Sequence, residues 1–153
     1  MDAKVRTCLA FRDEAEEAAR FYVSLLPGSE IERVFRPAPE ARALTVLFTL
    51  AGTPYQALNM GEPVTPTYAA SLSVVTRDQE ETDHLWTALI ADGGAPIQCG
   101  WLKDRFGLSW QIVPEALPRL LTDPDRAAAG RVMKAMMGMV KLDVAALEAA
   151  FRG

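Results

Sequence analysis

The residues of this chain that could do chemistry gather in one short stretch, which runs from Gln98 to Pro114 and reads QCGWLKDRFGLSWQIVP. Cys99, Trp101 and Lys103 stand at alternate positions, so an extended chain would point the three side chains to one side unless Gly100 introduces a bulge. A thiol beside an ammonium group can act as a nucleophile, because a nearby positive charge favours the thiolate. The stretch therefore predicts either a reactive cysteine or a well-packed hairpin.

A cysteine nucleophile also needs a base, and the chain offers little for that role. The sole histidine, His84, falls inside a predicted helix, where we expect an exposed surface residue. A buried structural role for Cys99 is thus the favoured interpretation, although the nucleophile stays open. The other cysteine, Cys8, is too distant in sequence for a disulfide framework or a zinc ribbon, which indicates reduced thiols.

Length and composition fit one globular domain over residues 1–153 that can bury a substantial core. The formal net charge of −4 argues against a nucleic-acid surface, which needs clustered Lys and Arg. No apolar run approaches the roughly 20 residues that span a bilayer. The N-terminal residues lack the apolar stretch of a secretory signal. We therefore expect a cytoplasmic protein that binds neither membrane nor nucleic acid.

The elements that must position these residues occur in a repeated order. A strand is predicted at 5–11, a helix at 13–26, and strands at 29–36, 42–51 and 55–60. The order then begins again, with a strand at 68–76, a helix at 78–92, and strands at 95–100, 101–103 and 108–113. This pattern predicts an α+β fold with βαβββ repeats at 5–60 and 68–114, followed by a helical extension at 115–153.

The extension is rich in alanine, leucine and methionine. Asp123 is predicted to cap one helix with Pro124 in its first turn, and Asp143 to cap the last helix. An apolar face is predicted for the first of these helices, formed by Val132, Met136, Met139 and Val140. Flexible thioethers fill irregular apolar gaps, so this face indicates core or subunit packing. A lid over a ligand is the alternative.

The repeated βαβββ order, Phe21-Tyr22 late in the first helix and the turn Asp104-Arg105-Phe106-Gly107 resemble the vicinal-oxygen-chelate superfamily of glyoxalases, bleomycin-resistance proteins and extradiol dioxygenases. Within it, ALNMGEP at 57–63 and the stretch from Gln98 are similar to a bacterial group labelled 3-demethylubiquinone-9 3-methyltransferase-like, a match that continues into the C-terminal helices. The resemblance implies cupped mixed sheets, a ligand in the cavity and a homodimer.

In metal-dependent members of the superfamily, His and Glu from the first, fourth, fifth and eighth strands hold a divalent ion. Carried onto this sequence, those positions fall at Thr7 or Cys8, at Ala57 or Asn59, at Ser71 and at Gln111. None is a histidine or a carboxylate, and neutral amides and hydroxyls do not make a tight site alone. The resemblance therefore implies no resident metal here, and we expect no cofactor.

Strand alternation predicts which side chains line the cavity. If Gln111 points inward, Ser109 does too, while Trp110 and Ile112 pack under the helices. The same rule puts Ser71, Ser73 and Val75 on one face, and Thr45, Leu47 and Thr49 on another. The candidate ligand-binding residues are Ser71, Ser73, Ser109, Gln111, Asn59, Trp101 and Cys99. The alternative is a filled polar core whose hydroxyls are satisfied internally.

The sequence favours a small-molecule-binding protein of this superfamily that lacks the usual metal ligands, with its ligand in a small polar cavity. The first alternative is an enzyme acting on a quinone or another aromatic molecule, as the group's label suggests, although the chain has no G-x-G-x-x-G loop for a nucleotide cofactor. The second is a metal-dependent glyoxalase- or dioxygenase-like enzyme. A homodimer would use the apolar cluster Met133, Met136, Met137 and Met139.

Overall fold

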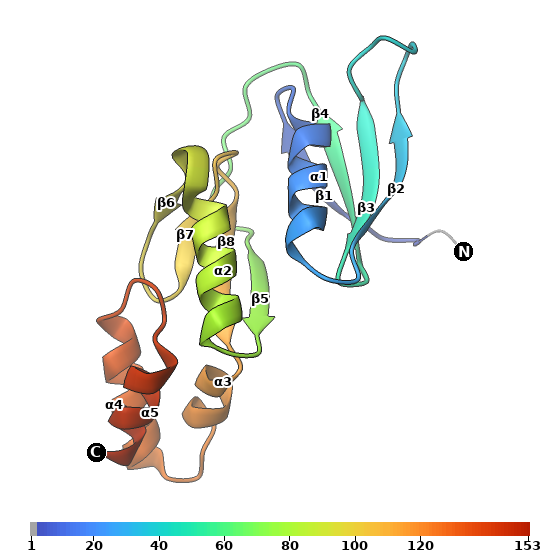
Figure 1. Ribbon diagram of the computed structural model, residues 1–153. Helices are drawn as coiled ribbons and strands as arrows, with labels where there is room; N and C mark the ends of the chain where they lie inside the picture. The colour runs from blue at the N-terminus through green and yellow to red at the C-terminus, as the bar shows by residue number, and fades with distance from the viewer. Residues whose placement is uncertain (1–2) are drawn as a thin grey trace. The chain divides into compact units, whose positions relative to one another are not determined.

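The computed structural model describes residues 3–153, which form two compact units, one ending at Thr65 and the other spanning Pro66–Gly153 (Figure 1). Each unit contains one predicted repeat. The expectation that residues 1–153 form a single domain stays a prediction, and the units are described separately.

Unit 1 contains the elements of the first repeat in the predicted order. These are β1 (Thr7–Phe11), α1 (Ala15–Leu25), β2 (Glu30–Phe35), β3 (Thr45–Leu50) and β4 (Thr53–Asn59). The sheet has the order β1-β4-β3-β2, in which β1 pairs with β4 in parallel and the other pairs are antiparallel. The mixed sheet confirms the fold predicted for this repeat.

One face of the unit 1 sheet is buried beneath α1. The buried residues of β3 alternate, with Val46, Phe48 and Leu50 on the covered face. Tyr22 on α1 is fully buried, while the small side chain of Ala18 lets the helix lie close to the strands. Complete burial of a large apolar side chain stabilises the fold by roughly 1.5–3 kcal/mol.

Unit 2 repeats the same plan and adds helices at its C-terminal end. Its sheet contains β5 (Leu72–Thr76), β6 (Ala95–Pro96), β7 (Trp101–Lys103) and β8 (Ser109–Pro114). The strand order is β5-β8-β7-β6, with β5 parallel to β8 and the other pairs antiparallel. The helix α2 (Gln79–Ile90) follows β5, and a short 3₁₀ turn, η1 (Ala91–Gly93), ends it. The α+β class and the second repeat are thereby confirmed.

The helix α2 covers one face of the unit 2 sheet. Asp78 caps it by accepting a hydrogen bond from the backbone N–H of Glu81. Trp86 on the helix and Trp110 and Ile112 on β8 are buried, as the alternation predicts. His84 lies on the exposed side of α2, which confirms the surface position expected for it.

The C-terminal extension folds into α3 (Ala116–Leu121), α4 (Arg126–Met137) and α5 (Val144–Arg152). The predicted cap of α4 at Asp123 is wrong by two residues. Asp125 accepts from the N–H of Ala128, whereas Asp123 accepts from the N–H of Asp125 and forms the turn before the helix. Asp143 caps α5 as predicted, by accepting from the N–H of Ala146.

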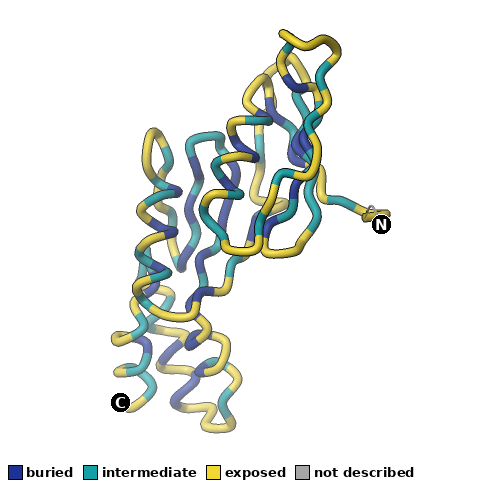
Figure 2. The backbone as a smooth tube through the Cα atoms, turned by 45° about the vertical axis from the view of Figure 1, so that its right-hand side comes forward, coloured by how far each residue is buried: buried dark blue, intermediate teal, exposed yellow. Residues whose placement is uncertain are grey.

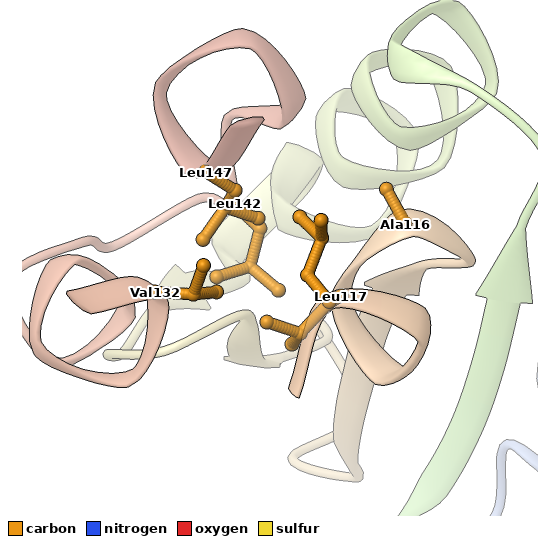
Figure 3. Packing of buried hydrophobic residues seen from close by; sticks show 6 residues of the cluster. Ala116, Leu117, Val132, Leu142 and Leu147 are labelled. Carbon is orange, nitrogen blue, oxygen red and sulfur yellow. The ribbon is translucent and has the colours of Figure 1, made fainter. Parts of the chain in front are cut away.

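A compact apolar cluster joins the three helices of the extension. Figure 3 shows Leu117, Val132, Leu142 and Leu147 directed toward one another from α3, α4, the α4–α5 connection and α5. In Figure 2 the buried segments of the extension alternate with exposed ones along each helix, as an amphipathic pattern requires. Of the predicted methionine face, Met136 and Met139 pack against this cluster, while Val140 is exposed.

Candidate functional site

The second face of the unit 2 sheet, opposite α2, collects most of the predicted site residues. Ser73 lies opposite Gln111, and Gln111 lies opposite Trp101, so the three side chains form one row across β5, β8 and β7. Lys103 lies opposite Ser109 in the neighbouring row. We call this surface the free face; it is defined by Ser71, Ser73, Val75, Ser109, Gln111, Val113, Trp101, Lys103, Ala95 and Ile97.

A side-chain hydrogen bond links two of the predicted positions on the free face. The amide Nε2 of Gln111 donates to Oγ of Ser71, at 2.9 Å. Ser71 immediately precedes β5 and is half-buried, as is Gln111. The Gln111 carbonyl oxygen and the Ser71 hydroxyl proton remain on the face to bond another molecule.

An open surface depression of about 340 Å³ lies beside this row. Its walls are formed by Tyr68, Ile97, Gln98, Cys99 and Trp101, and we call it the notch. The rings of Tyr68 and Trp101 meet edge to face, with centroids 6.2 Å apart and planes at 71°. The ammonium group of Lys103 lies 4.8 Å from the centroid of the Tyr68 ring. The notch is therefore an aromatic corner with a cation beside it.

Cys99 reaches the notch from a tight turn, not from an extended strand. The N–H of Trp101 donates to the carbonyl of Gln98 at 3.0 Å, and φ is +55° at Cys99 and +83° at Gly100. Two positive φ values between hydrogen-bonded ends are typical of a type I′ hairpin turn. The predicted strand at 95–100 consequently ends at Pro96. The turn at Gly100 is the exception left open for the alignment of Cys99 with Lys103, so that alignment does not apply.

The C-terminal extension holds this turn in place. The N–H of Cys99 donates to the carbonyl of Met139 at 2.9 Å, and the N–H of Gly100 donates to that of Val140 at 2.8 Å. Leu142 packs against Gly100 and is fully buried. The backbone N–H groups of Cys99 and Gly100 therefore both find acceptors in the segment between α4 and α5.

The turn at 104–107 orients β8. Asp104 is buried; its Oδ1 accepts from the N–H groups of Phe106 and Leu108, and its Oδ2 accepts from Nε1 of Trp110 at 2.9 Å. Buried carboxylates persist when they are hydrogen-bonded in this way. Asp104 thus fixes Trp110 under α2, which sets the opposite face of β8 for Ser109 and Gln111.

Ser109 is fully buried, and its Oγ has no hydrogen-bond partner within the described chain. A buried hydroxyl without a partner is destabilising, because it has lost its bonds to water. This contradicts, at this one position, the alternative of a polar core satisfied internally. The remaining serines of the face differ: Ser73 is exposed, and Ser71 is bonded to Gln111.

Asn59, the one candidate from unit 1, has structural bonds at both ends of its amide. Its Oδ1 accepts from the N–H of Ala15, at the start of α1, and its Nδ2 donates to the carbonyls of Asp13 and Ala43. Asn59 therefore lies on the helix-covered face of β4, together with the buried Ala57. The structure brings it into unit 1 and the other candidates into unit 2.

In unit 1 sequence reasoning proposed Cys8 as one alternative for the first strand but missed its neighbour Gln56 on the fourth. They lie opposite each other on the uncovered face of β1 and β4, and Nε2 of Gln56 lies 3.8 Å from Sγ of Cys8. In unit 2 the corresponding strands carry Ser73 opposite Gln111. Cys8 is exposed, yet partial desolvation raises the pKa of its thiol, and the Gln56 hydrogen bond offsets part of that effect. A comparison of strand register between the repeats would have found the pair.

These positions decide how well a divalent metal fits. The uncovered face of unit 1 carries the thiol of Cys8 and the amide of Gln56, and the uncovered face of unit 2 carries Ser71, Ser73 and the amide of Gln111. Neither set contains an imidazole or a carboxylate, and a single thiol, neutral amides and hydroxyls bind divalent ions weakly. Residues 3–153 also contain no group of three His, Cys, Asp or Glu side chains placed to hold a metal. A resident metal of the superfamily's kind does not fit.

Comparison with models of known protein families shows which family the chain belongs to. Residues 3–113 match the model of the family described as 3-demethylubiquinone-9 3-methyltransferase. The chain belongs to this family. The match ends inside β8, so the expected continuation into the C-terminal helices is wrong. No protein of curated function matches the chain.

Solved structures of several proteins share the fold of this chain. The PhnB protein of Bacillus cereus is 31% identical, over 73% of this chain and 99% of its own, with a TM-score of 0.66. Protein PA1353 of Pseudomonas aeruginosa is 20% identical, over 74% of this chain and 98% of its own, with a TM-score of 0.61. The fosfomycin resistance protein FosX of Listeria monocytogenes shares the fold, with 13% identity over 74% of this chain and 93% of its own and a TM-score of 0.52. The predicted vicinal-oxygen-chelate fold is confirmed.

Proposed function

We propose that this protein binds a small planar organic molecule at the notch and free face of unit 2. The observation that carries the proposal is the edge-to-face corner of Tyr68 and Trp101 beside the row of Ser73 and Gln111. Aromatic walls with a few polar groups at one side are the usual make-up of a ligand site.

The exposure of the aromatic residues supports a ligand that stacks. Tyr68 is 57% exposed although it contacts Trp101, and Val75 on the same sheet face is 62% exposed. Covering such apolar surface gains roughly 25 cal/mol per Å². The volume of about 340 Å³ lies at the small end of ligand pockets and suits one or two fused rings.

The side chains on the free face favour a protein that binds its ligand without converting it over an enzyme. The face carries serines, Gln111, Lys103 and apolar residues, and no histidine or carboxylate stands among them. General base catalysis needs a group that accepts a proton near neutral pH. The free face can hold and orient a ligand, and it lacks a residue suited to abstract a proton from one.

The family description raises methyl transfer as a second candidate. A doubly wound parallel sheet with a Gly-rich loop is the usual cradle of a nucleotide-derived methyl donor. The sequence has no G-x-G-x-x-G, and the sheets described here are four-stranded and mixed. The residues present do not fit that cofactor, and we derive no methyl-transfer step.

We further propose that the protein is bacterial, acts as a homodimer and works in the cytoplasm. The dimer is supported by exposed apolar side chains on and after α4, namely Met133, Met137 and Val140. Met136 and Met139, which the sequence placed in the same interface, pack inside the extension. The cytoplasm is supported by two free cysteines. Along residues 3–153, no helix has the length and apolar character to cross a bilayer.

A ligand screen tests the proposed function. We expect members of a panel of quinones and aromatic acids to raise the melting temperature, because a ligand that binds only the folded state stabilises it. Trp101→Ala should weaken binding by about tenfold through lost stacking and burial. Phe35→Ala, which truncates an exposed aromatic residue of unit 1 outside the notch, is the control and should leave the dissociation constant unchanged. A panel without any stabilising compound, or equal affinity in Trp101→Ala, would refute the proposal.

A further inference from the structure

We infer that the connection between α4 and α5 regulates the notch, and that Gln79 on α2 is the positioning residue through which it does so. The part of this connection that matters is residues 139–144, which we call the clamp. The inference rests on the proposed function and adds the element that controls the same site. The clamp does not line the notch, yet the notch keeps its shape only while the clamp is in place.

The notch depends on a hairpin that has few hydrogen bonds of its own. Three of its five lining residues, Ile97, Gln98 and Cys99, lie in the connection between β6 and β7. The strand β6 is two residues long, and its second residue, Pro96, has no N–H to donate. A hairpin with so short an arm is marginal in water, so contacts from outside it must hold these lining residues.

The first half of the clamp contacts the turn at the tip of this hairpin. The carbonyls of Met139 and Val140 accept from the N–H groups of Cys99 and Gly100, at 2.9 and 2.8 Å. Leu142, two residues further on, packs against Gly100 and belongs to the buried apolar cluster of the extension. A displacement of the clamp would therefore remove two hydrogen bonds and an apolar contact from the turn at once.

The second half of the clamp is held by Gln79, the first residue of α2. Its Nε2 donates to the carbonyl of Leu142 at 3.2 Å, and its Oε1 accepts from the N–H of Val144 at 2.8 Å. The same Nε2 donates to Oδ1 of Asp83 at 2.9 Å, which fixes the orientation of the amide. Lys141 also pairs with Asp83, at 2.5 Å, but both side chains are exposed and such pairs contribute little. Gln79 thus provides the main attachment of the clamp to α2.

The helix α2 is a firm support for this attachment, because its residues Leu85, Trp86 and Leu89 are buried. Without Gln79, the carbonyl of Leu142 and the N–H of Val144 would lose these hydrogen bonds, which favours a displaced clamp whose backbone groups bond to water. The physical path from α2 to the notch consists of Gln79, the clamp and the turn. Opening anywhere along it should lower the affinity for a ligand.

Amide hydrogen exchange followed by NMR tests the path without a ligand. Gln79→Met removes both ends of the amide and keeps a good helix former. We expect the amides of Cys99 and Gly100 to exchange about tenfold faster in this variant, because local opening exposes them. The amide of Asn59, which donates to the Leu44 carbonyl in unit 1, is the internal reference and should exchange at an unchanged rate.

A matched control removes bonds of the same kind elsewhere in the extension. Arg131 donates to the carbonyls of Ala150 and Phe151, beyond the clamp, so Arg131→Met should leave the exchange of Cys99 and Gly100 unchanged. Unchanged exchange in Gln79→Met, or equally faster exchange in Arg131→Met, would overturn the inference.

Calorimetric titration with 2-naphthol connects the clamp to binding. We expect the parent protein and Arg131→Met to bind it equally, and Gln79→Met about tenfold more weakly, because the ligand must first order the turn. Faster exchange with unchanged affinity would show that the clamp does not regulate the site and would overturn that part of the inference. A parent protein that does not bind 2-naphthol would count against the proposed function, while the exchange rates would still decide whether Gln79 and the clamp order the turn.

Discussion

At the scale of single residues, Cys99 is held in a backbone conformation that its side chain disfavours. Its φ of +55° lies in the left-handed region, where asparagine and glycine are preferred at this turn position. Cys99 is one of the residues that line the notch. A residue other than glycine or asparagine held in this region costs folding free energy.

The strain can be measured by substitution. Cys99→Asn should raise the free energy of unfolding by about 0.5–1 kcal/mol, because asparagine tolerates the left-handed region. Urea unfolding would show the gain as a higher midpoint with an unchanged slope. Cys99→Ala keeps a Cβ at the same φ and should bring no such gain. Equal stability of the two variants would show that the turn stores no strain.

Sequence reasoning identified the residues of the free face better than those of unit 1. Strand alternation from Trp110 correctly grouped Ser109 with Gln111. Because a large side chain such as Trp110 must be buried, it determines which face of the sheet every other side chain of the strand lies on. The sequence offered Ala57 or Asn59 for the fourth strand, and these two residues share one face of that strand, the face covered by the helix. The register between β1 and β4, which a single sequence does not reveal, places Gln56 on the uncovered face instead.

At the scale of elements, the hairpin of β6 and β7 depends on a close approach at Gly100. A Cβ added there would lie 2.9 Å from the carbonyl oxygen of Ile112 and 3.0 Å from a methyl group of Leu142. The carbonyl oxygen of Ile112 belongs to the backbone of β8, so it cannot move aside as the end of a flexible side chain could. The site turn, β8 and the extension therefore meet at a position that admits only glycine.

Two glycines with the same φ separate this clash from backbone strain. Gly100→Ala should cost about 2–4 kcal/mol, from strain and overpacking together. Gly107→Ala, at φ +84° with its nearest contact 3.6 Å away on Pro66, should cost about 1–2 kcal/mol from strain alone. Urea unfolding of both variants tests the difference. Equal losses would mean that the contact with Ile112 and Leu142 relaxes at no cost.

The elements that sequence reasoning missed are short. Its pattern predicted α1, α2 and the strands of both repeats, because each carries an apolar periodicity over several residues. The helix α3 is six residues long and includes Pro118, so propensity gave no signal for it. Its stability comes from Leu117 and Leu120, which are buried by contacts distant in sequence.

At the scale of the whole molecule, the exposed methionines make a prediction about assembly. Met133 and Met137 stand one helical turn apart on α4, 45% and 61% exposed, and a second copy would cover them. Light scattering after size exclusion should therefore give twice the chain mass of 16.7 kDa.

A double variant tests which surface is used. Met133→Lys with Met137→Lys should shift the measured mass toward the monomer, because charges are costly in an apolar interface. Lysines at the exposed positions Ala145 and Ala149 of α5 serve as the comparison and should leave the dimer intact if the methionines form its contact. A monomeric parent protein would contradict the dimer, and a dimeric double variant would assign it to another surface.

The two backbone bonds from Cys99 and Gly100 to the segment after α4 bear on how such chains can be recombined. The family match stops at residue 113, so the extension resembles a detachable appendage at the level of sequence. Because the extension is hydrogen-bonded to the tip of the hairpin, the two segments would have to be exchanged together between proteins. A chimaera that grafts the extension onto a shorter relative must bring the Cys99-Gly100 turn with it, and a chimaera that replaces the turn must supply new acceptors for its N–H groups.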